Sequence, residues 1–217
     1  MYDLDKMITE YLKKGRDTDT HTRHVGVFYA SEMGKCPRAI FLNYKCPRVE
    51  FPEETLKIFH MGDVIHDLIK EIFRQNEFKF LYFECPANIT DVLTPINIDG
   101  RIDIYGMNND GKRFAVELKS IKTIEYLKHN PLEHHTTQLM LYLRAKRLKE
   151  GYISYIEKNT LATKTFTVQY EEEIFQRILD KAREVYSCLL NGKAPEKKPS
   201  YPSECSYCQF KGVCKKL

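Results

Sequence analysis

The sequence lacks the features that mark membrane-spanning, secreted and low-complexity proteins. None of its apolar runs reaches the roughly 18 to 20 residues that a membrane-spanning helix needs. The charged start MYDLDKM does not follow the basic-then-apolar order of a secretory signal, and no internal repeat or biased tract is found. We therefore expect a soluble protein of the cytoplasm that makes no membrane contact.

A strong excess of charge of either sign is also missing. The chain has 34 Lys and Arg against 30 Asp and Glu, which gives a formal net charge of +4. This mild excess does not identify a polyanionic partner, but it excludes a strongly acidic surface that would repel one. With 42% hydrophobic and 12% aromatic side chains, 217 residues can bury a full-sized core, so we expect one domain over residues 1–217.

The seven cysteines are an odd number and are unevenly distributed. Such a set fits poorly with a disulfide framework and better with a metal or cluster site in a reducing compartment. Cys205, Cys208 and Cys214 crowd the C-terminal end, and the other four are spread over the chain: Cys36, Cys46, Cys85 and Cys188. The C-terminal cluster is therefore the feature that needs an explanation.

Hydrophobic periodicity predicts helices that alternate with strands. Helices are expected over residues 4–15, from Pro37 onward with Cys36 at the helix N-terminus, over 53–75 as a long and largely buried helix, and over 132–149 and 171–190. Strands are expected over residues 79–85, 92–98, 152–157 and 162–169, together with a hairpin formed by GRIDIYG, NNDG and KRFAVELKS. This order predicts an α/β fold with a mixed sheet flanked by helices.

The hairpin carries two carboxylates at matching distances from its turn. A turn centred on residue 110 pairs Asp103 with Glu117, and the alternation of a strand then places Lys119 on the same face as Glu117. Cross-strand partners have Cβ atoms about 4.5 to 5.5 Å apart, so the two acids repel each other unless a cation lies between them. A divalent ion is the natural remedy, and Lys119 adds a positive charge beside it.

Two acids, a lysine and a divalent ion suit phosphodiester hydrolysis. The ion polarises the phosphate and acidifies a water, while Lys119 positions that water or neutralises the developing charge. The plain alternative is a surface hairpin whose charges pair across the strands, because so short a pattern often arises by chance.

Polar residues outside the hairpin favour the first interpretation. Gln138 and Tyr142 lie one turn apart at the edge of an otherwise apolar helix face and need partners. His66 interrupts the long apolar helix of residues 53–75; it is either a satisfied core histidine or a nitrogen ligand for the same ion.

In this order the motifs resemble those of RecB-type nucleases of the PD-(D/E)xK superfamily. They are Gly62 to His66, Asp103 in GRIDIYG, Glu117-Leu118-Lys119, and Gln138 to Tyr142. The resemblance implies a restriction-endonuclease-like core in which His66, Asp103, Glu117 and the carbonyl of Leu118 bind Mg²⁺ or Mn²⁺. It also implies that Lys119 acts on the nucleophilic water and that Gln138 and Tyr142 hold DNA or orient the centre. Ile102 stands where the superfamily pattern has proline.

The C-terminal cysteines have the spacing of a metal clamp. Cys205-x₂-Cys208 followed by Cys214 leaves one vacancy in a tetrahedral sulfur set, and Cys36 is the best fourth ligand. Spacing alone does not separate a structural zinc site from a [4Fe–4S] cluster, because four thiolates serve both.

An early Cys-Pro-Arg with a late Cys-x₂-Cys-x₅-Cys resembles the iron–sulfur subset of RecB-like nucleases, above all the Cas-four-type CRISPR-associated exonucleases. This resemblance implies a [4Fe–4S] cluster held by Cys36, Cys205, Cys208 and Cys214 in a cap built from residues 1–50 and 192–217. It further implies 5′ to 3′ exonuclease activity on single-stranded DNA, in CRISPR adaptation beside the integrase proteins or in viral or phage DNA processing.

Two other functions stay open at this stage. One is a non-catalytic DNA-binding or scaffold module with a structural zinc or iron–sulfur site, and the other is a redox-sensing cluster protein, which leaves the hairpin residues unexplained. Basic clusters at residues 13–16, 144–149, 193–198 and 211–216 form either a rim that tracks phosphates or ordinary solvated faces.

Overall fold

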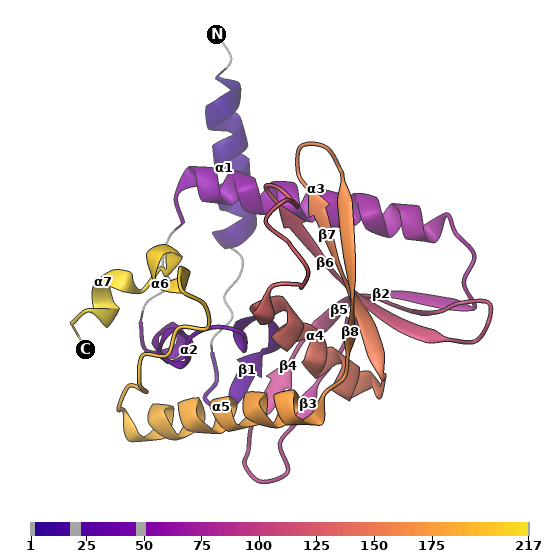
Figure 1. Ribbon diagram of the computed structural model, residues 1–217. Helices are drawn as coiled ribbons and strands as arrows, with labels where there is room; N and C mark the ends of the chain where they lie inside the picture. Colours follow the sequence, from indigo (N-terminus) through magenta and orange to yellow (C-terminus); the bar gives the residue numbers. More distant parts are fainter. Residues whose placement is uncertain (1–2, 18–22, 47–50, 217) are drawn as a thin grey trace.

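The computed structural model describes residues 3–17, 23–46 and 51–216. Its helices are α1 (Leu4–Asp17), α2 (Pro37–Lys45), α3 (Glu53–Arg74), α4 (Glu133–Lys146), α5 (Glu172–Asn191), α6 (Glu204–Tyr207) and α7 (Lys211–Cys214), with a 3₁₀ turn at Ala30–Glu32. Its strands are β1 (Val27–Tyr29), β2 (Phe80–Pro86), β3 (Ile89–Thr90), β4 (Asn97–Asp99), β5 (Arg101–Met107), β6 (Arg113–Ile121), β7 (Glu150–Glu157) and β8 (Thr163–Gln169). Figure 1 shows their arrangement in space.

The principal sheet is mixed, as the sequence predicts. Its five strands lie in the order β2-β5-β6-β7-β8, in which β6 and β7 are parallel and every other pair is antiparallel. A parallel pair needs a crossover connection, and α4 supplies it between β6 and β7. A second, small sheet has the order β1-β4-β3.

The hairpin of β5 and β6 has the predicted register. Ile104 lies opposite Val116 and Met107 lies opposite Arg113, so the two residues of each pair are equally far in sequence from residue 110, as predicted. Gly111 has a φ of +84°, a conformation that glycine adopts at little cost, and it closes the turn. The turn thus fixes which residues of the two strands meet in the middle of the sheet.

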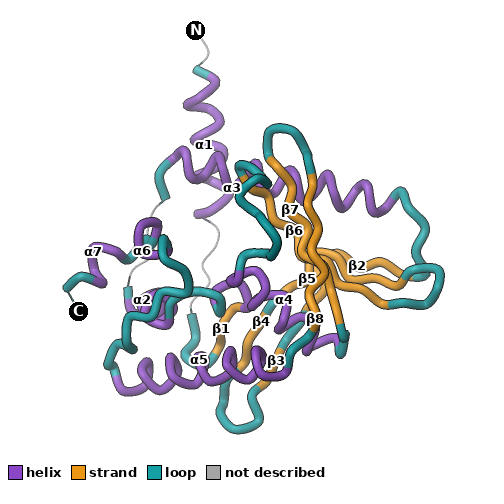
Figure 2. The backbone as a smooth tube through the Cα atoms, viewed as in Figure 1, coloured by secondary structure: helices purple, strands orange, loops and turns teal. Residues whose placement is uncertain are grey.

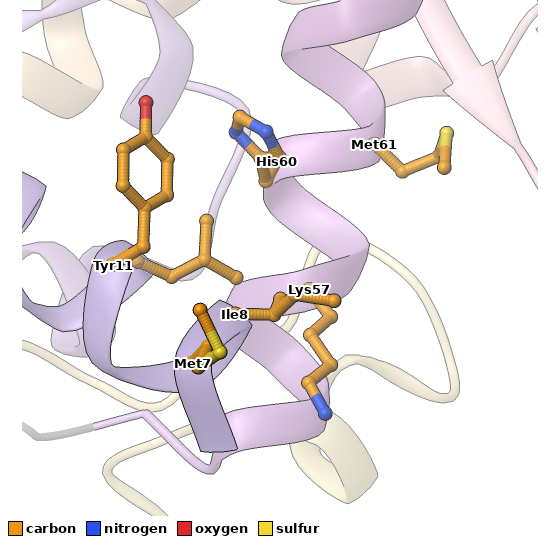
Figure 3. A pocket seen from close by; sticks show the side chains of 7 residues that line it. Met7, Ile8, Tyr11, Lys57, His60 and Met61 are labelled. Atoms are coloured by element: carbon orange, nitrogen blue, oxygen red, sulfur yellow. The ribbon is translucent and has the colours of Figure 1, made fainter. Parts of the chain in front are cut away.

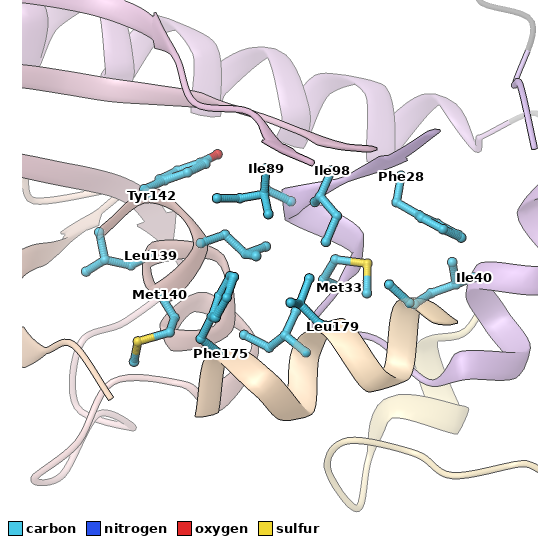
Figure 4. Packing of buried hydrophobic residues seen from close by; sticks show 14 of the residues in the cluster. Phe28, Met33, Ile40, Ile89, Ile98, Leu139, Met140, Tyr142, Phe175 and Leu179 are labelled. Carbon is cyan, nitrogen blue, oxygen red and sulfur yellow. The ribbon is translucent and has the colours of Figure 1, made fainter. Parts of the chain in front are cut away.

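Helices cover both faces of the five-stranded sheet. On one face α3 packs Ile65 against Ile104, Val116 and Leu118. On the other face α4 carries the larger core, in which Leu139 and its neighbours meet α5, α2 and the small sheet (Figure 4). Strand β6 therefore lies in the middle of the sheet with a helix above and below it.

The expectation that residues 53–75 form a largely buried helix is wrong. Helix α3 has the predicted extent, and Leu56 and Ile65 are buried, but a second apolar stripe is exposed: Ile58, Met61, Val64, Leu68 and Ile72. Only one side of α3 faces the sheet. Helix α1 packs against the N-terminal half of α3. Side chains of both helices line an apolar pocket of about 510 Å³ there (Figure 3).

The expectation of one strand over residues 92–98 is also wrong. Residues 92–95 form a turn between β3 and β4, and only residues 97 and 98 of the expected strand lie in β4. Asp91 organises the turn by accepting hydrogen bonds from the Thr94 hydroxyl at 2.6 Å and the Leu93 N–H at 3.4 Å. A side chain that bonds its own neighbouring backbone in this way favours a turn over an extended strand.

The C-terminal tail lies beside α2, as Figures 1 and 2 show. The buried Glu204 carboxylate accepts hydrogen bonds from the Cys36 N–H at 2.7 Å and the Ser200 N–H at 2.6 Å, and Gln209 donates to Asn43 at 3.0 Å. The C-terminal tail is thus hydrogen-bonded to α2 and to the residue that precedes it. In the described part of the chain, none of the helices combines the length and the apolar character needed to cross a membrane.

We predict that Asp91→Asn weakens the attachment of the β3–β4 turn to α5. Arg183 donates to both oxygens of the buried Asp91 carboxylate, at 2.9 and 2.7 Å, and these bonds hold the pKa of Asp91 well below its usual range. Because the folded-state pKa is lowered, the pair stabilises the fold above the ordinary aspartate pKa of about 4 and ceases to do so as the pH falls through the lowered value. We expect a loss of about 2 kcal/mol in the free energy of unfolding at pH 7.

Chemical denaturation at pH 7 and at pH 3 checks this prediction, since the difference between variant and wild type should shrink at the lower pH. Asp180→Asn is the matched control, because Asp180 binds the same guanidinium from an exposed position. It should cost less than about 0.5 kcal/mol. Equal losses in the two variants would contradict the assignment of the buried pair.

Candidate functional site

Asp103 and Glu117 lie together in the middle of the sheet and are nearly inaccessible to solvent, with exposed fractions of 8% and 2%. The backbone pairing of β5 with β6 ends at Ile104 and Val116, one position short of them. Beyond this point the Asp103 side chain replaces the backbone as hydrogen-bond acceptor, because its Oδ2 accepts the Leu118 N–H at 2.7 Å. The fork between the strands thus makes room for the two acids.

Burial and mutual repulsion act on both carboxyl groups. Burial raises the pKa of Asp103, against the opposing charges of His66 and Lys119. Burial also raises the pKa of Glu117, against the nearby Lys119 and together with the charge of Asp103. Two acids that repel each other in a desolvated place favour the arrival of a cation.

The available donors around the two acids fit a hard divalent ion. Glu117 Oε2 is fully buried and has no hydrogen-bond partner among the described residues. His66, one-quarter exposed on α3, brings its Nδ1 to 3.7 Å from Asp103 Oδ1. In the described chain, no three His, Cys, Asp or Glu side chains already stand in a metal-binding arrangement. The orphaned oxygen, a second carboxylate and an imidazole nonetheless form a donor set that Mg²⁺ or Mn²⁺ accepts.

Lys119, Gln138 and Tyr142 form one hydrogen-bonded chain that ends at the acids. The Lys119 ammonium lies 2.7 Å from Glu117 Oε1 and donates to Gln138 Oε1 at 3.0 Å. Gln138 Nε2 in turn donates to the Tyr142 hydroxyl at 2.9 Å. The sequence places the last two at the edge of a buried face, whereas the structure buries both. Their need for partners is met because they reach across to β6.

Tyr142 is fixed on its other side by a glycine. A Cβ atom added to Gly100 would come within 2.6 Å of the Tyr142 ring and 2.9 Å of Ala30. Burial raises the pKa of the Tyr142 hydroxyl, and the charge of Glu117 adds to this rise. The hydroxyl therefore stays protonated and serves the chain as a neutral hydrogen-bonding group.

Sequence reasoning missed a third acid in line with the first two. The antiparallel register of β2 and β5 sets Phe83 opposite Ile104 and Cys85 opposite Ile102, which leaves Glu84 level with Asp103. Glu84 has a φ of +49°, and its carboxylate lies 2.5 Å from the Lys70 ammonium. The predicted strand over residues 79–85 contained Glu84, but no sequence signal fixed its register against β5.

Sequence reasoning also missed the pair His134 and His135 at the start of α4. His135 Nδ1 lies 2.9 Å from the Tyr155 hydroxyl, and burial, with a contribution from the Lys119 charge, lowers the pKa of His135 to about 2. His134 stacks on Tyr201 with ring centroids 5.2 Å apart. The first turn of α4 therefore lies near enough to Lys119 to feel its charge, and it contacts Tyr201 of the C-terminal tail.

The four cysteines singled out by the sequence line one cavity of about 20 Å³: Cys36, Cys205, Cys208 and Cys214. None of the seven cysteines, all of which lie in the described chain, forms a disulfide. Burial raises the pKa of Cys208, and Cys214 and Cys205 are close enough to add to the rise. Four thiols around one small space are a donor set for a thiolate-bound metal centre. Cys46, Cys85 and Cys188 do not line this cavity.

The chain is similar to known nucleases. The chain is 23% identical to the CRISPR-associated exonuclease Cas4 of Saccharolobus solfataricus. The match covers 96% of this chain and 98% of that protein.

Among solved structures, the crystal structure of SSO0001 superposes with a TM-score of 0.69 and 24% identity, covering 97% of this chain and 98% of the other. The alkaline exonuclease LHK-Exo of Laribacter hongkongensis gives a TM-score of 0.53 and 11% identity, over 84% and 93% of the two chains. The complex of LHK-Exo with dAMP gives a TM-score of 0.52 and 12% identity, over 77% and 90%. These likenesses identify the fold.

The family model for the PD-(D/E)XK nuclease superfamily matches residues 73–215, a stretch that contains the acidic hairpin, Lys119, α4 and the C-terminal cysteines. This chain therefore belongs to the PD-(D/E)XK nuclease superfamily.

Proposed function

We propose that this protein is a metal-dependent deoxyribonuclease that degrades single-stranded DNA from the 5′ end, in the manner of Cas4. The observation that carries the proposal is the orphaned Oε2 of Glu117, buried beside Asp103 and Lys119 in a chain of nuclease lineage. Its relatives named exonucleases support the exonucleolytic mode. The superfamily uses divalent metal ions, and Mg²⁺ or Mn²⁺ suits the oxygen-rich donor set.

The residues divide the work of hydrolysis by position. Asp103, Glu117, the Leu118 carbonyl and His66 would hold the ion, which when bound polarises the scissile phosphate and lowers the pKa of a water. Lys119 places a positive charge where negative charge develops on the phosphate, and it orients the attacking water. Gln138 and Tyr142 hold the ammonium in that direction, because the lysine has three donors on a flexible stem.

We predict that Lys119→Ala and Glu117→Gln each lower the cleavage rate of 5′-labelled single-stranded DNA in Mn²⁺ by at least about 100-fold. The first removes the charge beside the acids, and the second removes the anionic ligand. Lys122→Ala is the control, since Lys122 is an exposed lysine on the loop that follows β6. Circular dichroism and a thermal melt verify folding. Wild-type rates in either variant would remove the catalytic assignment, and no cleavage by the wild type would favour a non-catalytic DNA-binding module.

We further predict that Tyr142→Phe lowers kcat about tenfold and leaves KM for DNA close to the wild-type value. The variant keeps the ring that packs on Gly100 but loses the hydroxyl that accepts from Gln138, so Lys119 is aimed less well. Single-turnover and steady-state rates separate the two parameters. Tyr155→Phe tests a neighbouring buried hydroxyl that binds Leu132 and His135 instead. If KM changes while kcat does not, Tyr142 contributes to binding and does not position Lys119.

We infer that Cys36, Cys205, Cys208 and Cys214 hold a metal centre, and we propose a [4Fe–4S] cluster. The early Cys-Pro-Arg and the late cysteine triplet support iron and sulfide. All four cysteines line the same small cavity between α2 and the C-terminal tail. Zinc is the second candidate because four thiolates bind it as well.

Cys36→Ala tests this centre. Anaerobically purified wild-type protein should be brown and contain about four iron and four sulfide per chain, and the variant should lose colour and melt at a lower temperature. Cys188→Ala is the control, because Cys188 lies on α5 outside the cavity. Colourless protein with one zinc per chain would replace the cluster with a zinc site.

The proposed setting follows from the same lineage. DNA with single-stranded ends is the proposed substrate, the CRISPR integrase proteins are proposed partners, and the cytoplasm is the proposed location. We also propose that the N-terminal 50 residues and residues 192–217 form a cap that the metal centre fastens. The hydrogen bonds of Glu204 to Cys36 and of Gln209 to Asn43 support this cap, while residues 18–22 and 47–50 lie outside the described part.

A further inference from the structure

Beside the acidic centre, Glu84 lies between two cations. Its carboxylate is 2.5 Å from the Lys70 ammonium through Oε1 and 4.0 Å from Arg101 Nε through Oε2. Lys70 follows His66 by one turn of α3, and Arg101 precedes Asp103 by two residues on β5. Both cations are therefore set by the elements that set the proposed metal ligands.

The two cations differ in burial, and each has a need that a phosphate meets. Only 12% of the Lys70 side chain is exposed, so its ammonium requires an anion nearby. The Arg101 side chain is 72% exposed, and its planar guanidinium can accept a phosphate with two parallel hydrogen bonds. An anion that reached both would lie at the edge of the acidic centre.

Two carboxylates lie beside the Lys70 ammonium, Glu84 at 2.5 Å and Asp67 at 3.8 Å, and the nearer one, Glu84, has a strained backbone. Its φ of +49° is in the left-handed region, which is unfavourable for a residue with a side chain. Its carboxylate also belongs to a residue level with Asp103 on the adjacent strand, a placement in which like charges repel each other. A glutamate that is strained and repelled by its neighbours is held mainly by Lys70, so a competing anion can displace it.

We propose that Lys70 and Arg101 bind a phosphate of the DNA strand next to the scissile one, and that Glu84 occupies this site as a displaceable counterion when DNA is absent. This inference rests on the proposed function, because it assigns a subsite of the same centre. A phosphodiester carries the single negative charge that the carboxylate carries, so the exchange conserves the charge around Lys70. Glu84 lies level with Asp103, so the subsite is about one nucleotide from the acids.

Binding of single-stranded oligonucleotides in metal-free buffer, measured by fluorescence anisotropy at several salt concentrations, tests the proposal without cleavage. Lys70→Met and Arg101→Gln should each weaken binding about fivefold and reduce the slope of log K against log salt by about 0.7. Glu84→Gln should strengthen binding about threefold, because it removes the competing charge. Glu150→Gln is the matched control, since Glu150 pairs with Lys112 at 2.5 Å near the hairpin turn, and it should leave affinity unchanged.

The form of the DNA identifies the source of the phosphate. Losses confined to linear strands with a 5′-phosphate assign the subsite to the terminal phosphate, and equal losses on 5′-hydroxyl and circular strands assign it to an internal phosphodiester. Both results support the proposal. Weaker or unchanged binding by Glu84→Gln would overturn the counterion role, and unchanged binding by folded Arg101→Gln would overturn the phosphate site.

Failure of this subsite is distinguishable from failure of the proposed function. Variants that bind DNA like the wild type, in a protein that still cleaves it, overturn the subsite alone. A wild type that binds DNA with these variant effects and yet does not cleave it overturns the nuclease proposal and leaves the phosphate site standing. Titration of Mn²⁺ by calorimetry adds one check: a loss of metal affinity in Glu84→Gln without a change in DNA affinity would make Glu84 a metal ligand and contradict the counterion role.

Discussion

The burial of two carboxylates in the middle of the sheet is the constraint that the rest of the site serves. Taking a carboxylate out of water costs several kcal/mol unless partners replace the lost hydration. Asp103 has the Leu118 N–H, and Glu117 has the Lys119 ammonium on one oxygen only. The remaining oxygen of Glu117 has no partner among the described residues, which is unfavourable for stability and leaves this oxygen available to the proposed metal ion.

The topology makes this burial possible. Strand β6 is central, with β5 antiparallel on one side and β7 parallel on the other, so its side chains face helices on both faces. The parallel pair requires a crossover, and α4 therefore passes over β6 at the level of Lys119. The hydrogen bond between Lys119 and Gln138 of α4 thus depends on the parallel direction of β6 and β7. At its N-terminal turn the same helix meets Tyr201 of the tail, so the acids and the cysteines share a support.

The parts of the fold that were predictable from sequence are those with strong local signals. The hairpin register follows from the position of its turn, which alone places Asp103 and Glu117 at matching distances from residue 110. The exposure of α3 was not predictable, because an apolar stripe looks the same whether it faces a sheet or solvent. The turn at residues 92–95 was missed because Asp91 acts through its side chain, which alternation of apolar residues does not reveal.

The residues around the acids that were missed share one property, which is that long-range register decides their place. Glu84 comes level with Asp103 because β2 pairs with β5 in one register. Lys70 reaches Glu84 because of the way in which α3 packs across the sheet. Net charge was equally uninformative, because a formal charge of +4 says nothing about where cations stand.

What matters for a polyanion approaching two carboxylates is the charge within a Debye length of about 8 to 10 Å. Lys70, Arg101 and Lys119 supply three positive charges there, against three carboxylates on neighbouring strands. Asp67 adds a further carboxylate 3.8 Å from the Lys70 ammonium, so the positive charges do not outnumber the acidic groups. A divalent ion at the proposed site would add positive charge to this set. Attraction of a phosphate would then increase with occupation by the metal, which a uniformly basic surface would not achieve.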